Sequence, residues 1–237
     1  MDPFAPSPHF LPRWFTRWFY ASCALFLIAG IANALSGGST EGLNLWGAAV
    51  GMLAMYLLVR IVWQRIADPR AFVARLPWPL LLKFVLIGWL FAEIDELLNF
   101  PFNPFAPGVT LLEDIVLTTP MYILAHPGWY WILKTYRFGR FQALITGGFA
   151  LGLFEVFSGG VGPAALLVLP VLPLAIMIHG LHMVMPPMLL EEQLARLERK
   201  DTRWKYALGV LIPAAGVLLG IGIANVIQFP VRYLLGA

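Results

Sequence analysis

Three carboxylic acids and one amide stand at the end of a single apolar stretch. Residues 91–99 read Phe-Ala-Glu-Ile-Asp-Glu-Leu-Leu-Asn, so that Glu93, Asp95, Glu96 and Asn99 follow one another closely. At about 100° per residue of α-helix, these four side chains share an arc of roughly 160°. Glu93 and Glu96 are three residues apart on one helix face, which is a suitable arrangement for a general acid and a general base.

Other acidic residues are predicted to lie at the same depth in neighbouring helices. Glu113 and Asp114 open the next apolar segment, and Glu155 ends the one after it. A charge at the centre of a bilayer costs about 2.5–3.5 kcal/mol on the insertion scale, so these groups must face protein or water rather than lipid. Carboxyl groups crowded in a low dielectric cannot all ionise, and some must keep a proton or share a cation.

The acidic groups predict acid–base chemistry on a lipid or isoprenoid substrate within the membrane. In this hypothesis Glu93 and Glu96 are the catalytic pair. Glu155 and Asp114 adjust the protonation of that pair or bind a cation, and His126, near the middle of the fourth apolar segment, relays protons. The substrate and any cofactor stay open, because no motif in the sequence names a reaction.

Two other classes of protein fit the same residues. In a proton- or cation-coupled transporter or an ion-binding protein, the acids with Asn99 and Asn103 would form an ion path or hold a hard cation such as Ca²⁺. In a non-catalytic helical subunit of a larger membrane complex, Glu113 and Asp114 would merely favour a helix N-terminus. Arg232 is the one candidate counter-ion that the sequence offers in this half of the spans.

His179 and His182 are the other residues whose spacing could carry chemistry. They stand three apart near the inner end of the sixth apolar segment, so they share a helix face and are candidates for a metal site. The zinc pattern HExxH is absent and no cysteine can assist, which leaves a core or headgroup-contacting pair as the simpler interpretation. The predicted topology places this pair half a membrane thickness from the outer acids.

Membrane-spanning helices must position these residues, because the chain has the composition of a membrane protein. Of its 237 residues, 59% are hydrophobic and 12% are charged, whereas soluble domains have about 25% charged residues. The mean hydropathy is +0.77, and about 20 apolar residues span the ~30 Å hydrocarbon core. The sequence predicts an all-α transmembrane bundle, one integral membrane domain over 1–237, with seven spans at about 16–36, 44–64, 78–100, 111–133, 140–158, 163–185 and 205–228.

Basic residues set the predicted orientation. Fifteen of the 16 Lys and Arg residues precede the first span or lie in or beside the even-numbered connections, and only Arg232 lies beyond the last span. Cytoplasmic loops hold the excess of Lys and Arg, which predicts a cytoplasmic N-terminus, an external C-terminus and a multi-pass protein of a bacterial plasma (inner) membrane. Ala32-Asn33-Ala34 resembles a signal-peptidase site, but the apolar stretch is long for a signal peptide, so a retained first helix is expected.

The remaining patterns concern packing and partners. Residues 187–204 combine leucines at helical spacing with charges, which predicts an amphipathic segment on the cytoplasmic leaflet. Close helix packing is predicted at Gly147, Gly148, Gly152, Gly216, Gly220 and Gly222. The expected partners are membrane lipids, a hydrophobic small-molecule ligand and other membrane proteins. Nucleic acid is not expected, because no basic patch interleaved with aromatic residues occurs on a soluble surface.

Overall fold

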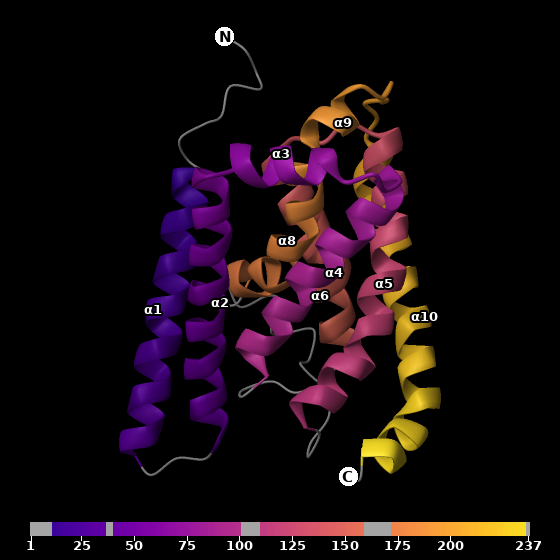
Figure 1. The fold of residues 1–237 in the computed structure, drawn as a ribbon. Coiled ribbons are helices and arrows are strands. Elements are labelled where there is room, and N and C mark those ends of the chain that lie inside the picture. Colours follow the sequence, from indigo (N-terminus) through magenta and orange to yellow (C-terminus); the bar gives the residue numbers. More distant parts are fainter. Residues whose placement is uncertain (1–10, 37–39, 101–109, 159–171, 236–237) are drawn as a thin grey trace.

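The computed structural model describes residues 11–36, 40–100, 110–158 and 172–235, and every regular element within these ranges is a helix (Figure 1). The helices are α1 (Arg13–Leu35), α2 (Thr40–Gln64), α3 (Ala67–Arg75), α4 (Leu80–Asn99), α5 (Leu111–Thr135), α6 (Arg140–Ser158), α8 (Leu172–Leu189), α9 (Glu191–Ala195) and α10 (Trp204–Leu235). An isolated bridge between Tyr136 and Lys200 joins the segment before α6 to the segment before α10.

The seven predicted spans are helical over most of the residues that the structure describes, and the exceptions, Ser36, Trp78, Pro79 and Phe100, lie at span ends. The spans overlap α1, α2, α4, α5, α6, α8 and α10, although residues 163–171 of the sixth lie outside the described residues. The long helices alternate in direction along the chain. As a result α3 and α9 lie at the same end of the bundle as the start of α1, and α10 ends at the opposite end (Figure 1).

Three helices have the length and composition of a membrane span on their own: α1, α8 and residues Trp204–Gln228 of α10. Residues Ala49–Gln64 and helix α3 give a fourth candidate if they are counted as one span, although a 78° bend separates them. Among the described residues this number is lower than the seven predicted spans. Helix α4 shows one physical cause, because four charged side chains fall within its 20 residues: Lys83, Glu93, Asp95 and Glu96.

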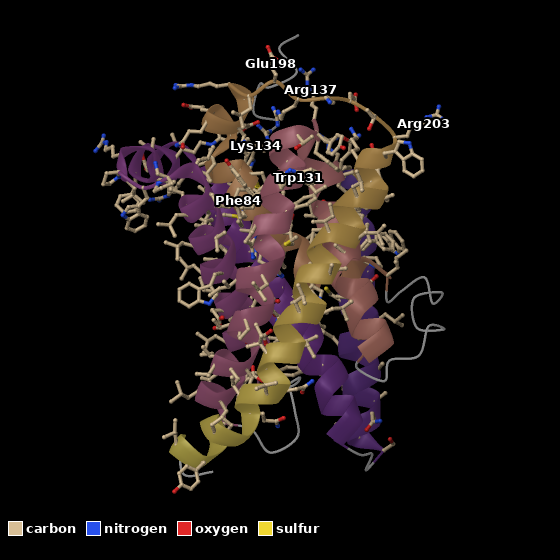
Figure 2. The ribbon with its side chains drawn as sticks, turned by 90° about the vertical axis from the view of Figure 1, so that its right-hand side faces the viewer. Phe84, Trp131, Lys134, Arg137, Glu198 and Arg203 are labelled. Atoms are coloured by element: carbon tan, nitrogen blue, oxygen red, sulfur yellow. The ribbon has the colours of Figure 1, made fainter. Side chains whose placement is uncertain are left out.

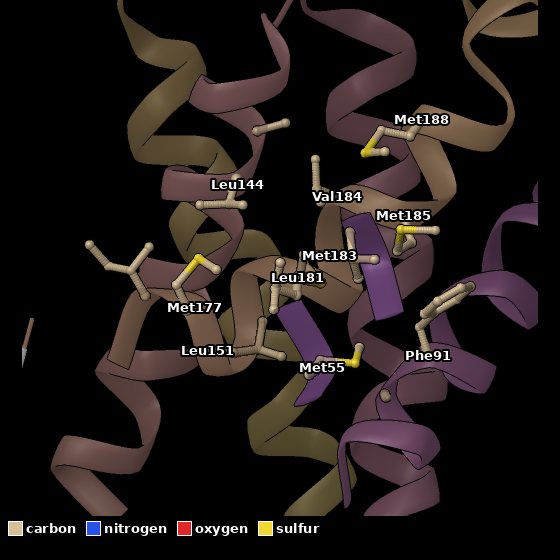
Figure 3. Packing of buried hydrophobic residues seen from close by; sticks show 14 of the residues in the cluster. Met55, Phe91, Leu144, Leu151, Met177, Leu181, Met183, Val184, Met185 and Met188 are labelled. Carbon is tan, nitrogen blue, oxygen red and sulfur yellow. The ribbon is translucent and has the colours of Figure 1, made fainter. Parts of the chain in front are cut away.

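Helix α8 lies at the centre of the bundle and supplies much of its core. It packs against α6 and α4 and also touches α1, α2 and α5, and most of it is buried. Its side chains meet those of α2, α4 and α6 in Figure 3, where the labels mark Met177, Leu181, Met183, Val184, Met185 and Met188 of α8 beside Met55, Phe91, Leu144 and Leu151. Methionine fills irregular gaps, which suits a helix that is contacted from several sides.

The end of α8 continues through Pro186 and Pro187 to Leu189. Because proline has no backbone N–H, Pro187 cannot donate to the carbonyl of Met183, four residues earlier. Trp129 of α5 supplies the missing donor, since its Nε1 donates to Met183 O at 2.8 Å where both residues are fully buried. A freed carbonyl inside a membrane protein needs such a partner, and this one lets the helix continue beyond the predicted end of the span at residue 185.

Glycines bring neighbouring helices into close contact. A Cβ atom added at Gly216 or Gly220 of α10 would lie 2.3 Å or 2.4 Å from backbone atoms of α5, and one added at Gly148 of α6 would lie 2.3 Å from the backbone of α8. The predicted close packing is confirmed at these three positions, where only a residue without Cβ fits. At Gly222 the prediction is wrong, because an added Cβ would have no neighbour within 4 Å.

Helix α3 lies across one end of the bundle, close to α9 (Figure 1). Arg70 of α3 donates from Nε to Met188 O at 2.9 Å and forms an ion pair with Glu191. Helix α9 is five residues long, so it covers a small part of the predicted amphipathic segment 187–204. Figure 2 shows the labelled residues Arg137, Glu198 and Arg203 at this same end.

Candidate functional site

Helices α4 and α5 pack together, and the polar side chains of α4 lie against α5. Thr119 donates from Oγ1 to Glu93 Oε1 at 2.7 Å and accepts a hydrogen bond from Trp89 Nε1 at 3.2 Å. The other carboxyl oxygen of Glu93, Oε2, is buried and has no hydrogen-bond partner in the described part of the chain. Leu90 and Leu97, which are 52% exposed, occupy the outer face of α4, so the carboxyl groups face protein.

Tyr122 holds the second glutamate of the predicted pair. Its hydroxyl group donates a hydrogen bond to Glu96 Oε1. Side chains on a helix lean toward the helix N-terminus, and α4 and α5 run in opposite directions, so Glu96 and Tyr122 lean toward each other. Each glutamate therefore receives a hydroxyl group from α5: Glu93 from Thr119, and Glu96 from Tyr122 three residues further along both helices.

The ring of Tyr122 also contacts the histidines of α8. The ring centroids of Tyr122 and His182 lie 5.2 Å apart. The ring centroid of His182 also lies 5.7 Å from that of His126 and 5.6 Å from that of His179. Nε2 of His182 and Nδ1 of His179 are 3.4 Å apart, and all three histidines are buried. A line of titratable side chains in contact therefore leads from Glu96 through Tyr122 to His182 and its two neighbours.

This contact corrects the placement of the histidine pair expected from the sequence. A span over 163–185 puts His179 and His182 near its inner end, half a membrane thickness from the outer acids. Helix α8 continues to Leu189, and His182 lies about two turns before that end and beside Tyr122. Because Tyr122 also donates to Glu96, the histidine pair lies closer to the acidic groups than the sequence predicts.

His126 is oriented by a carbonyl oxygen and by a glycine. Its Nδ1 lies 2.7 Å from Tyr122 O, and because a carbonyl only accepts, Nδ1 must carry the hydrogen. In the neutral ring Nε2 is then the acceptor, and it is buried with no hydrogen-bond partner among the described residues. A Cβ atom added at Gly88 of α4 would lie 2.1 Å from Nε2, so the ring occupies space that only glycine leaves open.

Two other acids of this region have structural partners. Asn99 donates from Nδ2 to the backbone O and to Oδ1 of Asp95, at 2.9 and 3.0 Å. Glu113 and Thr110 form a capping box, in which Thr110 N donates to Glu113 Oε2 at 2.6 Å and Glu113 N donates to Thr110 Oγ1 at 3.3 Å. A capping box stabilises the first turn of a helix, so Glu113 has the structural role that the sequence offered as an alternative.

The structure describes the remaining predicted site residues only in part. Asp114 is buried and lies close enough to Glu93 for the two carboxyl groups to interact electrostatically. Glu155 falls within α6, but its side chain lies outside the described residues, as do Asn103 and the side chain of Arg232. In the part of the chain that the structure describes, no group of three or more His, Cys, Asp or Glu residues is arranged to hold a metal ion.

Sequence reasoning misses the side chains that hold the two glutamates. Thr119 and Tyr122 lie in the middle of α5, an apolar helix whose polar residues carry no recognisable motif. The available signal is the pair Thr118-Thr119 followed by Tyr122 and His126, which places a polar stripe at helical spacing on one side of the helix. Gly88 is a second residue that the sequence does not single out.

Comparison of the chain with protein-family models, with curated proteins and with solved structures found no match.

Proposed function

We propose that this protein is a seven-span membrane enzyme that transfers protons to and from a lipid or isoprenoid substrate. In this proposal Glu93 and Glu96 are the general acid and base, and the N-terminus faces the cytoplasm. Seven long helices that alternate in direction support the number of spans. The basic residues support the orientation, because fifteen of the 16 fall on one side of a seven-span arrangement.

The observation that carries the proposal is the hydroxyl group opposite each glutamate. Thr119 fixes one oxygen of Glu93, and the other, Oε2, is buried without a hydrogen-bond partner among the described residues, so that this atom is available to give a proton to a substrate or to take one. Tyr122 fixes Glu96 in the same way. General acid–base catalysis requires positioned groups within hydrogen-bond reach of the reacting proton, and these two contacts supply the positioning.

The proposed reaction moves protons only. One carboxylic acid adds a proton to a carbon–carbon double bond of the substrate, and the other group, as a carboxylate, removes a proton from a neighbouring carbon. The double bond shifts, no oxidant is needed, and the two glutamates exchange their protonation states. Tyr122 and the histidines beside it return the proton, while Asp114 and Glu155 influence the charge of the pair or share a cation.

Solvent deuterium tests this proposal without knowledge of the substrate. The purified protein is reconstituted into liposomes made from the lipid extract of its source membrane, and the liposomes are incubated in D₂O. An enzyme that adds and removes protons at carbon incorporates deuterium into one lipid class, which mass spectrometry detects. We expect the wild-type protein to label that class and Glu93→Gln to label it at least 100-fold more slowly, because general acid–base groups contribute about 10²–10⁴-fold.

Glu198→Gln is the matched control, since Glu198 is exposed at the far end of the bundle (Figure 2). This variant should label the same lipids at the wild-type rate. If no lipid gains deuterium with the wild-type protein, or if Glu93→Gln and Glu96→Gln label as fast as Glu198→Gln, the enzyme proposal is wrong.

A proton-coupled transporter is the second candidate, and the line from Tyr122 through His182 to His179 favours it. These groups extend away from the acids along the buried helix α8, as a path for protons would. A pH-sensitive dye enclosed in the same liposomes distinguishes the two functions. The transporter is supported over the enzyme if the enclosed dye reports acidification under an imposed pH gradient, if Glu96→Gln abolishes this acidification, and if no lipid gains deuterium.

A further inference from the structure

A small cavity with an excess of positive charge lies at the end of the bundle that carries α3 and α9. Its volume is about 60 Å³, which is enough for more than one water molecule. Apolar residues such as Leu133, Val184 and Met188 form its inner wall. Its polar lining consists of Arg140, Glu191 and Arg199, so the lining carries two guanidinium groups and one carboxylate.

The carboxylate is already shared between two arginines. Arg140 Nη2 lies 3.0 Å from both oxygens of Glu191, and Arg70 forms an ion pair with the same group. Three guanidinium groups, those of Arg70, Arg140 and Arg199, therefore surround one carboxylate, which leaves two positive charges in excess. The neighbouring carboxylates Glu192 and Glu198 are exposed and do not line the cavity.

Nε of Arg140 and the guanidinium of Arg199 make no hydrogen bond with a described residue. Arg140 Nε is buried without a hydrogen bond, and the guanidinium is held in place by Trp63, whose ring centroid lies 4.5 Å from Cζ. Arg199 is half-buried and makes no hydrogen bond or ion pair with a described residue. Burial and the nearby Arg137 lower the pKa of the Arg199 guanidinium, and the carboxylate of Glu191 offsets this only in part.

Helix α6 adds to the positive potential, because it begins at the cavity. Arg140 is its first residue, and Ala143 of its first turn lines the cavity. The N-terminus of a helix carries a partial charge of about +0.5 and presents backbone N–H groups, which favours bound anions. The N-terminus of α6 and the surplus of guanidinium groups both favour an anion bound in this cavity.

We propose that this cavity binds a phosphate-type oxyanion, with Arg199 and Arg140 as its charged ligands. Guanidinium groups recognise phosphate oxygens through parallel N–H donors. The site lies at the opposite end of the bundle from Glu93 and does not depend on the acid–base proposal. A phosphate group could come from an anionic lipid headgroup at the membrane surface or from a phosphate compound in solution.

Thermal unfolding measures the binding and separates the two sources. The delipidated full-length protein in detergent is titrated with inorganic phosphate, with chloride at equal ionic strength as the reference. The same protein is then placed in phosphatidylcholine nanodiscs with or without phosphatidylglycerol. A rise in Tm with inorganic phosphate shows that soluble phosphate compounds enter the site, and a rise only with phosphatidylglycerol shows that the headgroup is the ligand.

Arg199→Gln should weaken the anion response about tenfold, the loss of one charge-assisted hydrogen bond of about 1.4 kcal/mol. Arg203→Gln, which removes an exposed charge outside the cavity (Figure 2), should keep the full response. Ala195→Glu places a competing carboxylate at the cavity lining and should abolish the response even if Arg199→Gln fails to fold. The proposal is overturned if neither probe raises Tm, or if Ala195→Glu and Arg199→Gln respond as Arg203→Gln does.

Discussion

Single hydroxyl groups decide how the acids of α4 are held. Thr119 and Tyr122 each donate to a glutamate across the interface between α4 and α5. A hydrogen bond to a charged group contributes about 1.5–3 kcal/mol, and removal of one partner leaves the other unsatisfied in a medium without water. These two hydroxyl groups therefore stabilise the bundle and fix the direction of the carboxyl groups at once.

Tyr122→Phe isolates one of these hydroxyl groups, because the aromatic ring that contacts His182 stays in place. We expect the free energy of unfolding to fall by about 1–3 kcal/mol, since Glu96 loses its donor. Denaturant titration of the detergent-solubilised protein measures the change. Tyr130→Phe is the control on the same helix, where the hydroxyl makes no hydrogen bond with a described residue and the ring packs on Phe84. Equal losses in the two variants would contradict the role of the Tyr122 hydroxyl.

Among the helices, α8 stays helical across Pro186 and Pro187, where one indole group replaces a missing backbone donor. The N–H of Trp129 satisfies the carbonyl of Met183 that Pro187 leaves without its helical donor. The Met183 carbonyl belongs to the residue directly after His182, whose ring contacts Tyr122. The position of the histidines in the site is therefore a property of the contact between α5 and α8.

Trp129→Phe should destabilise the protein by about 1–3 kcal/mol, because the Met183 carbonyl is left unsatisfied. In the Pro187→Ala background a backbone N–H returns, so we expect the same change to cost about 1 kcal/mol less. The double-mutant cycle cancels the loss of indole volume, which is common to both backgrounds. Trp131→Phe, at an exposed position of α5, should change stability by about 0.5 kcal/mol or less. Additive effects of Trp129→Phe and Pro187→Ala would show that the indole does not replace the missing backbone donor.

Considering the whole molecule, the outward faces of α1 and α10 carry many exposed large hydrophobic residues. The exposed large hydrophobic residues of α1 and α10 include Leu25, Ile28, Ile31, Leu211, Leu218, Leu219 and Val226. A water-soluble monomer rarely exposes a continuous apolar surface of this kind, whereas lipid tails are a suitable surrounding. The charged residues Arg137, Glu198 and Arg203 lie together at one end (Figure 2), as expected where a bundle meets water.

Cysteine accessibility tests the number of spans. In a Cys23→Ser background, single cysteines replace Trp78, Leu112 or Arg137, which are exposed at successive turning points of the chain. Seven spans predict that a membrane-impermeant maleimide labels Leu112→Cys in intact cells, and labels Trp78→Cys and Arg137→Cys only after permeabilisation. If only the three or four most apolar candidates cross the membrane, all three positions lie on one side. Identical labelling of the three variants would therefore contradict the seven-span proposal.

The helices and the protein-facing side of α4 follow from local patterns of residues. Runs of about 20 apolar residues have few alternatives to a helix, because backbone groups in lipid must pair within their own segment. The spacing of Glu93 and Glu96 placed them on one face, and the structure turns that face toward protein. The sequence also offered a structural role for Glu113 at a helix N-terminus, and in the structure Glu113 forms a capping box with Thr110 there.

The side chains that meet the acids depend instead on how the helices pack. The partners Thr119 and Tyr122 are ordinary residues of an apolar helix, and His182 contacts Tyr122 from α8. Pro186 and Pro187 favour an early end when they are read locally, because each removes a backbone donor. The indole of Trp129, 54 residues earlier in the chain, supplies a donor in their place. Contacts between side chains so far apart in sequence follow from how the helices pack, and no local pattern of residues encodes them.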